Sequence, residues 1–453
     1  MGYLNTLINE YRSMTYHVDV IVLSNIPKDL GTDIEVIVGL PTKDPWSLPF
    51  GHKKIFAERA DDYDLFIYSE DDTLISENNI TAFLDVTTVL PDNEIAGFMR
   101  YEIDASGKKY ISTAHSHYHW LPDTVESHGD YTFARFTNDH SACYLLTRDQ
   151  LKKAIESGGY LVAPHQGRYD LLCSAATDPY TQCGFSKVIC VSPFHDFLIH
   201  HMPNQYIGKL GVALNEFELQ LRELIAMKMD NQKNGQLFQT EKNLPTAKWN
   251  KSYYEPCRND LLELVPQHAE SVLSVGCGWG VTEAELVAKG CRVVAIPLDS
   301  IIAAVAQARG VTAIPPSFDS GIQLLADDHF DCIIFSNILQ HLSDPAGILS
   351  RYSKVLSKNG IIVLSVPNLN HIKIWRDYKL SKNFHLSNNF DVTQLHFTTE
   401  KMVETWFNKS GLERVLMKYN FEDRYEKISR KSLGMIDALL ASEMVFVGRR
   451  SGG

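Results

Sequence analysis

The sequence predicts an α/β protein made of two domains, and three observations support this. Its 453 residues are enough for two or three cores of ordinary size. In both halves, short apolar runs alternate with helical stretches. A polar stretch near residues 230–246 separates the halves. We therefore expect a first domain over 1–212, a helix and polar linker over 213–246, and a second domain over 247–450.

The composition narrows the class of protein. Hydrophobic residues make up 44% of the chain and charged residues 22%, the balance of a folded globular protein. The formal net charge of −12 argues against a nucleic-acid partner, because phosphate binding needs clustered Lys and Arg. Eight scattered cysteines without a CxxC pair indicate a reducing compartment. No apolar run reaches the length of about 18 residues needed for a transmembrane helix.

The first half contains five apolar runs that we expect to be strands. They are "VDVIVLS" (18–24), "YDLFIYS" (63–69), "IAGFMRYE" (95–102), "SACYLLT" (141–147) and "SKVICVS" (186–192). "TRDQLKKAIESG" (147–158) and "LNEFELQLRELIAMK" (214–228) have the apolar spacing of helices. This alternation is typical of an α/β domain.

The run at 63–69 ends abruptly in three carboxylates, Glu70, Asp71 and Asp72. Ligands of α/β sheets bind outside the carboxyl ends of the strands. Oxygen ligands there suit Mg²⁺ or Mn²⁺ bridging to a diphosphate, which is a poor leaving group until a metal neutralises it. The alternative is a solvated turn without a ligand.

The residues from "HVDVIVLSN" through "DLFIYSEDD" to "FHDFLIHHMPNQY" resemble the GT-A fold of glycosyltransferases, over about residues 1–210. Its metal motif of the Asp-x-Asp type is here Glu-Asp-Asp. The resemblance implies that Asp72 holds Mn²⁺ or Mg²⁺. Glu70 and Asp71 would then contact the ribose of a nucleotide-sugar donor, metal-bound water, or both. The first residues, "YLNTLINEYRSM", resemble the helix that follows the first strand of that fold, which implies that this strand is replaced or that the nucleotide pocket is incomplete.

The same resemblance implies two further groups in the first domain. One is a late histidine on the metal, for which His200 and His201 are the candidates. The other is a carboxylate base beside the acceptor hydroxyl, for which we favour Asp170 over Asp178. Each of these side chains could instead serve the fold, the carboxylates as helix caps and the histidines as surface or core groups.

The second half contains a glycine-rich loop between a strand and a helix. "VLSVGCGWG" (272–280) places Gly276, Gly278 and Gly280 after the strand and before the helix "TEAELVAKG". "CRVVAI", "FDCIIFS" and "NGIIVLSVPN" supply further apolar strands. Glycines let the backbone approach a ligand closely, and the helix N-terminus offers free N–H groups to an anion. Taken alone, such a loop is a weak signal.

The segments "FDCIIFSNILQHLSDP", "VLSKNGIIVLSVPN" and "LHFTTEKMVETWFNKSGL" strengthen that signal. In order and spacing they resemble class I S-adenosylmethionine-dependent methyltransferases, over about residues 250–420. "YYEPCRNDLLELVP" resembles the segment that closes over the cofactor. The resemblance implies cofactor contacts from the loop and from the end of the fourth strand, by Gly276, Cys277, Gly278, Gly280, Asn337 and Ile338. It places His341 on the substrate side, as a base, an orienting group or a structural histidine.

Two departures from that family concern the cofactor's acidic partners. Ser274 stands where the first strand usually carries an acid, and Pro297 stands where an acid usually binds the ribose hydroxyls. In this chain either the backbone or Asp299, two residues on, would then have to bind the ribose. Asp319 is a candidate for the adenine amino group, or else a loop cap.

Together these interpretations predict a bifunctional transferase. The first domain would add a sugar from a nucleotide-sugar donor to a glycan or lipid-linked glycan, and the second would O-methylate a sugar hydroxyl, as in surface polysaccharide synthesis. Two alternatives stay open: a second domain that only docks partners, and a small-molecule methyltransferase with an inactive first half. We expect a cytoplasmic protein, associated with a membrane only through its acceptor.

Overall fold

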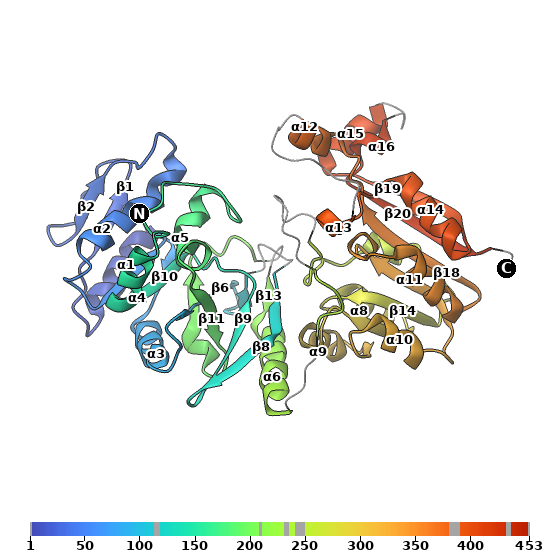
Figure 1. Ribbon diagram of the computed structural model, residues 1–453, viewed down its shortest axis with the longest axis horizontal. Helices are drawn as coiled ribbons and strands as arrows, with labels where there is room; N and C mark the ends of the chain where they lie inside the picture. The colour runs from blue at the N-terminus through green and yellow to red at the C-terminus, as the bar shows by residue number, and fades with distance from the viewer. Residues whose placement is uncertain are drawn as a thin grey trace. The chain divides into compact units, whose positions relative to one another are not determined.

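The computed structural model describes residues 2–112, 118–207, 211–230, 235–240, 250–379, 390–431 and 436–451. The chain forms two compact units, unit 1 over Met1–Gln232 and unit 2 over Lys233–Gly453 (Figure 1). The division falls inside the segment 213–246 that the sequence predicts to be a helix and linker. Residues 231–234 and 241–249 of that segment lie outside the described residues.

Unit 1 is an α/β unit whose helices are interspersed with short strands (Figure 1). Its helices are α1 (Gly2–Ser13), α2 (Gly51–Glu58), α3 (Glu77–Thr87), α4 (Arg148–Glu156), α5 (Leu171–Thr181) and α6 (Leu214–Asp230). The larger sheets have the orders β5-β11-β9-β8 and β13-β7-β6-β12-β4, and β1-β2 and β10-β3 are separate pairs. The strands are β1 (Ile21–Ser24), β2 (Glu35–Val38), β3 (Leu65–Ser69), β4 (Thr73–Leu74), β5 (Glu94–Ala96), β6 (Met99–Ile103), β7 (Lys109–Ile111), β8 (Trp120–His128), β9 (Tyr131–Phe136), β10 (Cys143–Thr147), β11 (Ser186–Cys190), β12 (Leu198–His201) and β13 (Val212–Ala213).

Strand pairing places the acidic turn of unit 1 between two other strands. β3 pairs antiparallel with β10, and beyond its end Glu70 N–H donates to the carbonyl of Ala142 at 2.9 Å. β4 pairs antiparallel with β12, opposing Thr73 and His201. The turn 70–72 is therefore held at both ends, next to the last residue of β12.

Unit 2 is built on one seven-stranded sheet of order β16-β15-β14-β17-β18-β20-β19. The first five strands are parallel, and β20 runs antiparallel to β18 and β19. The bounds are β14 (Ser271–Cys277), β15 (Arg292–Pro297), β16 (Thr312–Ala313), β17 (Phe330–Ser336), β18 (Leu356–Pro367), β19 (Leu412–Asn420) and β20 (Glu443–Arg450). The order reverses between β14 and β17, and such a switch point is where open α/β sheets bind ligands.

Helices cover both faces of this sheet, so its central strands are apolar on both sides, as parallel strands usually are. One face packs against α10 (Phe318–Leu324), α11 (Pro345–Tyr352) and α14 (Glu400–Ser410). The other packs against α7 (Asn259–Leu262), α8 (Val281–Ala288) and α9 (Ser300–Ala308). The remaining helices are α12 (Ile372–Lys379), α13 (Phe390–Thr393), α15 (Asp423–Lys431) and α16 (Asp437–Leu440).

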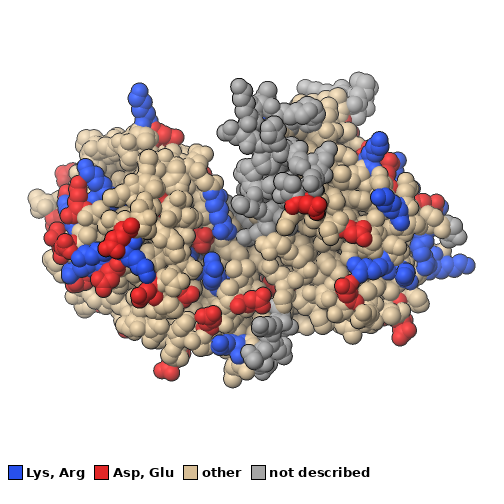
Figure 2. All heavy atoms as spheres, viewed as in Figure 1, with Lys and Arg blue, Asp and Glu red and all other residues tan. Residues whose placement is uncertain are grey.

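The prediction of an α/β chain is confirmed, and each predicted strand contains or overlaps an observed one. The run 95–102 is an exception in detail, because it divides into β5 and β6 around Gly97 and Phe98. On the face drawn in Figure 2, positive and negative side chains intermingle over both units. Among the described helices, none is long and apolar enough to cross a membrane.

Candidate functional site

The glycine-rich loop of unit 2 follows β14, the strand beside the switch point. Gly276 and Gly280 both have φ of +81°, a conformation that favours glycine. A Cβ at Gly276 would collide with Ile338, and one at Gly278 would collide with the carbonyl group of Tyr253. The sequence predicts that Gly278 makes room for a cofactor. In the structure, the backbone of Tyr253 occupies this closest approach.

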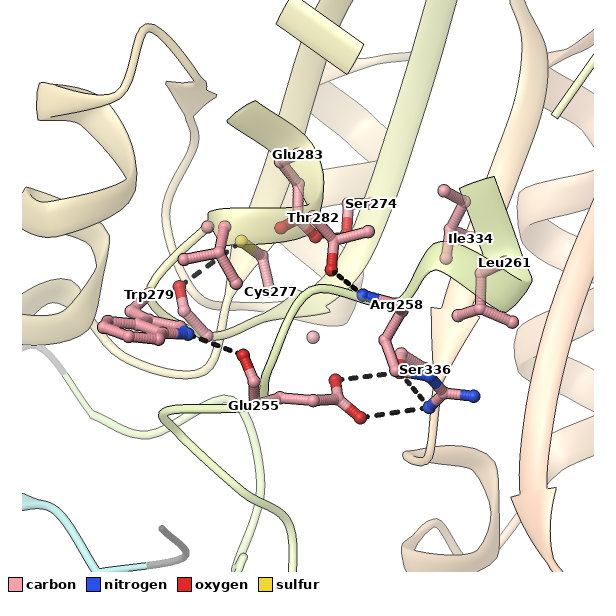
Figure 3. Close-up of a pocket in the computed structure, with 14 residues that line it drawn as sticks. Glu255, Arg258, Leu261, Ser274, Cys277, Trp279, Thr282, Glu283, Ile334 and Ser336 are labelled. Carbon is pink, nitrogen blue, oxygen red and sulfur yellow. Dashed lines mark hydrogen bonds and ion pairs between the residues drawn. The ribbon is translucent and has the colours of Figure 1, made fainter. Parts of the chain in front are cut away.

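The segment predicted to close over the cofactor lies directly on this loop. The backbone N–H of Trp279 donates to the carbonyl of Tyr253 at 3.0 Å, and its indole N–H donates to the carbonyl of Glu255 at 2.6 Å. Figure 3 shows Trp279 turned toward the backbone of Glu255, whose carboxylate points the other way, toward Arg258 and Ser336. The loop and the covering segment together line a pocket at the end of β14.

A charged network extends from this pocket to the end of β17. The Glu255 carboxylate accepts from Lys251 Nζ at 3.1 Å and from Arg258 Nη1 at 3.1 Å. Arg258 Nη2 reaches Glu443 at 2.7 Å, and Lys251 Nζ donates to the carbonyl of Ser336 at 2.6 Å. Burial would raise the pKa of Glu255, but the two cations outweigh burial and lower it. These residues form no known motif in the sequence, where their only signal is the charge pattern of "KSYYEPCR".

The carboxylate of Glu283 lies beside Ser274, the position in the first strand where the family resemblance leads us to expect an acid. Ser274 in β14 donates through Oγ to Glu283 Oε1 at 2.6 Å, and both side chains are buried. Glu283 lies in the first turn of α8 and lines the same pocket. The acid missing from the strand is therefore supplied by the following helix.

The predicted residues after β17 lie together at the switch point. Asn337 has φ of +50°, and its Nδ2 donates to Glu443 at 2.6 Å. Its Oδ1 is buried with no hydrogen-bond partner among the described residues. Ile338 is fully buried in the core. His341 is 4% exposed, and its ring stacks on that of Phe238 with centroids 5.6 Å apart.

Two predicted cofactor residues have other partners in the structure. Asp299 is 1% exposed and caps α9, its Oδ1 accepting from the N–H of Ile302 at 2.8 Å. Burial raises its pKa to about 7. Asp319 is exposed on the first turn of α10, where it pairs with Arg351. Asp299 is thus engaged in helix capping and Asp319 in a surface ion pair, and their contacts with the ribose and the adenine of a cofactor stay predictions.

In unit 1 the structure brings Asp72 and His201 together. His201 Nε2 lies 3.5 Å from Asp72 Oδ2, and His201 Nδ1 lies 2.6 Å from Glu102 Oε1. The second oxygen of Glu102 accepts from the N–H of Tyr206 at 2.9 Å, and Glu102 is 1% exposed. Burial would raise the pKa of Asp72, but the hydrogen bond and charge of His201 lower it. Glu102, which the sequence analysis missed, thus orients His201 toward Asp72.

His200 faces away from Asp72, because successive side chains of a strand point to opposite faces. Its ring stacks on Tyr101 with centroids 5.1 Å apart, and its Nε2 lies 3.1 Å from Asn204 Oδ1. The prediction that His200 binds a metal ion stays a prediction, and the orientation of its ring favours His201 over it. Of the two histidines, only His201 lies beside Asp72.

Glu70 is associated with a histidine that the sequence analysis did not name. His140 Nε2 lies 3.4 Å from Glu70 Oε1, and neither atom has a hydrogen-bond partner in the described structure. Asp71 is exposed. Desolvation is the largest cause that raises the pKa of its carboxyl group, and the charge of Asp72 is the second.

A buried lysine holds the turn that carries His140. Lys187 is 3% exposed, and its ammonium donates to the carbonyls of Asn138 and Asp139 at 3.3 and 3.2 Å and to Ser141 Oγ. Burial lowers its pKa to about 8. Its stem fills the space that a side chain at Gly97 would need.

The two candidate bases of unit 1 both have structural partners. Asp170 is exposed and caps α5, accepting from the N–H of Cys173 at 2.9 Å. Asp178 is fully buried, in contact with Lys53 Nζ and with His165 Nε2 at 3.0 Å. The role of Asp170 as a catalytic base stays a prediction. In the described part of the chain there is no group of three or more His, Cys, Asp or Glu side chains that could hold a metal ion.

Comparison with known proteins finds that unit 2 is similar to methyltransferases. Residues 249–424 match the model of a methyltransferase-domain family. Ubiquinone biosynthesis O-methyltransferases of Paracidovorax citrulli and Xylella fastidiosa are 28% and 32% identical over 113 and 126 residues. These matches cover 24% and 25% of this chain and 48% of each relative, so the chain spans about half the length of these curated relatives. A S-adenosylmethionine-dependent methyltransferase of Archaeoglobus fulgidus is 12% identical with a TM-score of 0.34, covering 43% of this chain and 91% of that one. Residues 249–424 therefore match a methyltransferase domain, and the sheet of unit 2 has the parallel, Rossmann-like strand order of such a domain.

The stability of the Asp299→Asn variant relative to the wild type is expected to increase with pH. Folding raises the pKa of Asp299 from 3.8 to about 7, so its contribution to stability is full below pH 4 and is lost as the pH rises through 7. Asn caps a helix as well as Asp but does not titrate. The difference in unfolding free energy, variant minus wild type, should increase by about 2–3 kcal/mol from pH 5 to pH 8. Urea titration at the two pH values measures this difference. A pH-independent difference would contradict the titration of this carboxyl group.

Asp178→Asn should destabilise unit 1 by about 3 kcal/mol or more, because it leaves Lys53 buried without its ion-pair partner. Asp170→Asn is the matched control, since Asn keeps the helix cap and the change should cost well under 1 kcal/mol. Urea unfolding of both variants measures the difference. Equal stabilities would show that the Lys53–Asp178 pair does not support the fold.

Proposed function

We propose that unit 2 transfers the methyl group of S-adenosylmethionine to a hydroxyl group of its substrate. The observation that carries this proposal is the parallel sheet with a glycine-rich loop at its switch point, in the residues that match a methyltransferase domain. The curated relatives named as O-methyltransferases support the choice of oxygen as acceptor.

The residues at this switch point fit such a cofactor. The N-terminus of α8 has no side-chain cap, so its N–H groups can bind a carboxylate. The buried Oδ1 of Asn337 and the carboxylate of Glu283 can accept from an ammonium or hydroxyl group. When bound, the cofactor supplies an electrophilic methyl group on a positively charged sulfur.

We assign to His341 the task of holding the acceptor hydroxyl. It follows β17, on the side of the switch point where the substrate is expected. A neutral imidazole there orients the hydroxyl and takes its proton as the oxygen is methylated. The buried surroundings of His341 exclude water from this transfer.

His341→Gln should lower methyl transfer by about 10²–10⁴-fold and leave the affinity for S-adenosylhomocysteine within a few-fold of wild type. Calorimetry measures the affinity, and labelled methyl transfer to a panel of phenols and nucleotide sugars measures the activity. His371→Gln is the control, a buried histidine that packs against Tyr425. A folded wild-type protein that does not bind S-adenosylhomocysteine would overturn the proposed function.

For unit 1 we propose metal-dependent glycosyl transfer, which Asp72, His201 and Glu102 favour. A carboxylate and an imidazole oriented by a second carboxylate make a two-residue site for Mn²⁺ or Mg²⁺. Such an ion takes its remaining ligands from water and from the diphosphate of a nucleotide sugar. Glu70 and Asp71 adjoin this site and are the candidates for contacts with the donor.

The two proposed activities on one chain suggest a shared product. Unit 1 would add a sugar to a glycan or lipid-linked glycan, and unit 2 would methylate a hydroxyl of that sugar. A docking role for unit 2 and an inactive unit 1 remain the competing hypotheses. Binding of S-adenosylhomocysteine argues against the first, and sugar transfer by unit 1 against the second.

His201→Ala should weaken Mn²⁺ binding at least about tenfold in the presence of UDP or GDP, and Asp72→Asn should weaken it as much. His200→Ala is the matched control, because its side chain lies on the other face of β12. Electron paramagnetic resonance of Mn²⁺ measures binding without requiring activity. Equal binding by the two histidine variants, or full sugar transfer in EDTA, would exclude the metal site.

A further inference from the structure

A short segment of the chain lies across the cofactor end of the sheet in unit 2. We call residues 235–240 the strap. The backbone N–H of Leu237 donates to the carbonyl of Leu298 at 2.8 Å, and the Leu237 side chain is buried in the domain core. The ring of Phe238 stacks on Phe318 and on His341, with centroids 6.4 and 5.6 Å apart.

These three partners belong to the segments that follow three different strands at one edge of the sheet. Leu298 follows β15, Phe318 begins α10 after β16, and His341 follows β17. Because β15, β16 and β17 are parallel, their carboxyl ends share that edge. The strap thus contacts loops on both sides of the switch point, where the adenosine part of a cofactor would bind.

The strap is also tied to the segment that covers the glycine loop. Gln236 Nε2 donates to the hydroxyl of Tyr253 at 3.2 Å, and the N–H of Lys251 donates to the carbonyl of Thr240 at 3.3 Å. The hydroxyl of Tyr253 in turn contacts the buried carboxyl group of Asp299. One continuous set of contacts therefore joins the strap, the covering segment and the loop.

We propose that the strap is an autoinhibitory element that competes with the adenosine part of the cofactor. Phe238 provides a flat apolar ring between Phe318 and His341, where an adenine would stack. Cofactor binding then requires the strap to leave, so the measured affinity is the intrinsic affinity reduced by the fraction of molecules in which the strap is open. While the strap is in place, Phe238 also covers His341 from the acceptor. This inference rests on the proposed methyl transfer by unit 2.

Phe238→Ala tests the competition in the full-length chain. Loss of the stacked ring should populate the open strap and raise the affinity for S-adenosylhomocysteine about three- to tenfold, as measured by calorimetry. Leu324→Ala, which trims a side chain that is 61% exposed at the end of α10, is the control and should leave the affinity unchanged. An unchanged or weaker affinity of Phe238→Ala would overturn the proposal, because Phe238 would then be a wall of the cofactor site.

Hydrogen exchange gives a second readout in the wild-type protein. The amide of Leu237 is hydrogen-bonded to Leu298, so a peptide covering the strap should exchange slowly without ligand and faster with S-adenosylhomocysteine. Slower exchange on binding would overturn the proposal, since the strap would then close over the cofactor. If neither wild type nor Phe238→Ala binds S-adenosylhomocysteine while both are folded, the proposed function of unit 2 fails, and the competition with it.

Discussion

The close crossing of two backbones, Tyr253 over Gly278, is the constraint on which the cofactor end of unit 2 depends. The carbonyl of Tyr253 accepts from the N–H of Trp279, and no side chain at position 278 would fit beneath it. This crossing fixes where the covering segment turns. Lys251 and Arg258 are thereby brought to the end of β17 on either side of Glu255, and Tyr253 is placed against Asp299.

The same edge of the sheet combines buried charge with buried apolar surface. Glu255 remains ionised because its two cations outweigh the cost of burial, whereas Asp299 has no such cation and holds its proton to near neutral pH. Two carboxyl groups on one edge therefore differ in charge because of their neighbours. The electrostatic field at the switch point is set by the covering segment as much as by the strands.

The elements of both units could be predicted from sequence more fully than the sites. Buried parallel strands appear as continuous apolar runs, so β14, β15 and β17 were recognisable. The choice between His200 and His201 depends on the register of β12 against β4, which a local pattern does not reveal. Glu102 and Glu283 come into place only through tertiary packing. Asp299 carried a local signal, since an Asp directly before an apolar helical run is typical of an N-cap. The strap has no periodicity, so its position could not be inferred before the fold was known.

Neither Lys187 nor Gly97 can be substituted without affecting the other. The lysine stem occupies the volume of the absent side chain at Gly97, while its ammonium holds three groups of the turn that carries His140. A larger residue at 97 would displace the lysine, and a shorter residue at 187 would leave buried carbonyls without a donor. Homologous chains that keep this turn should therefore either retain both residues or exchange them together, which makes positions 97 and 187 a joint marker for tracing unit 1 in distant sequences.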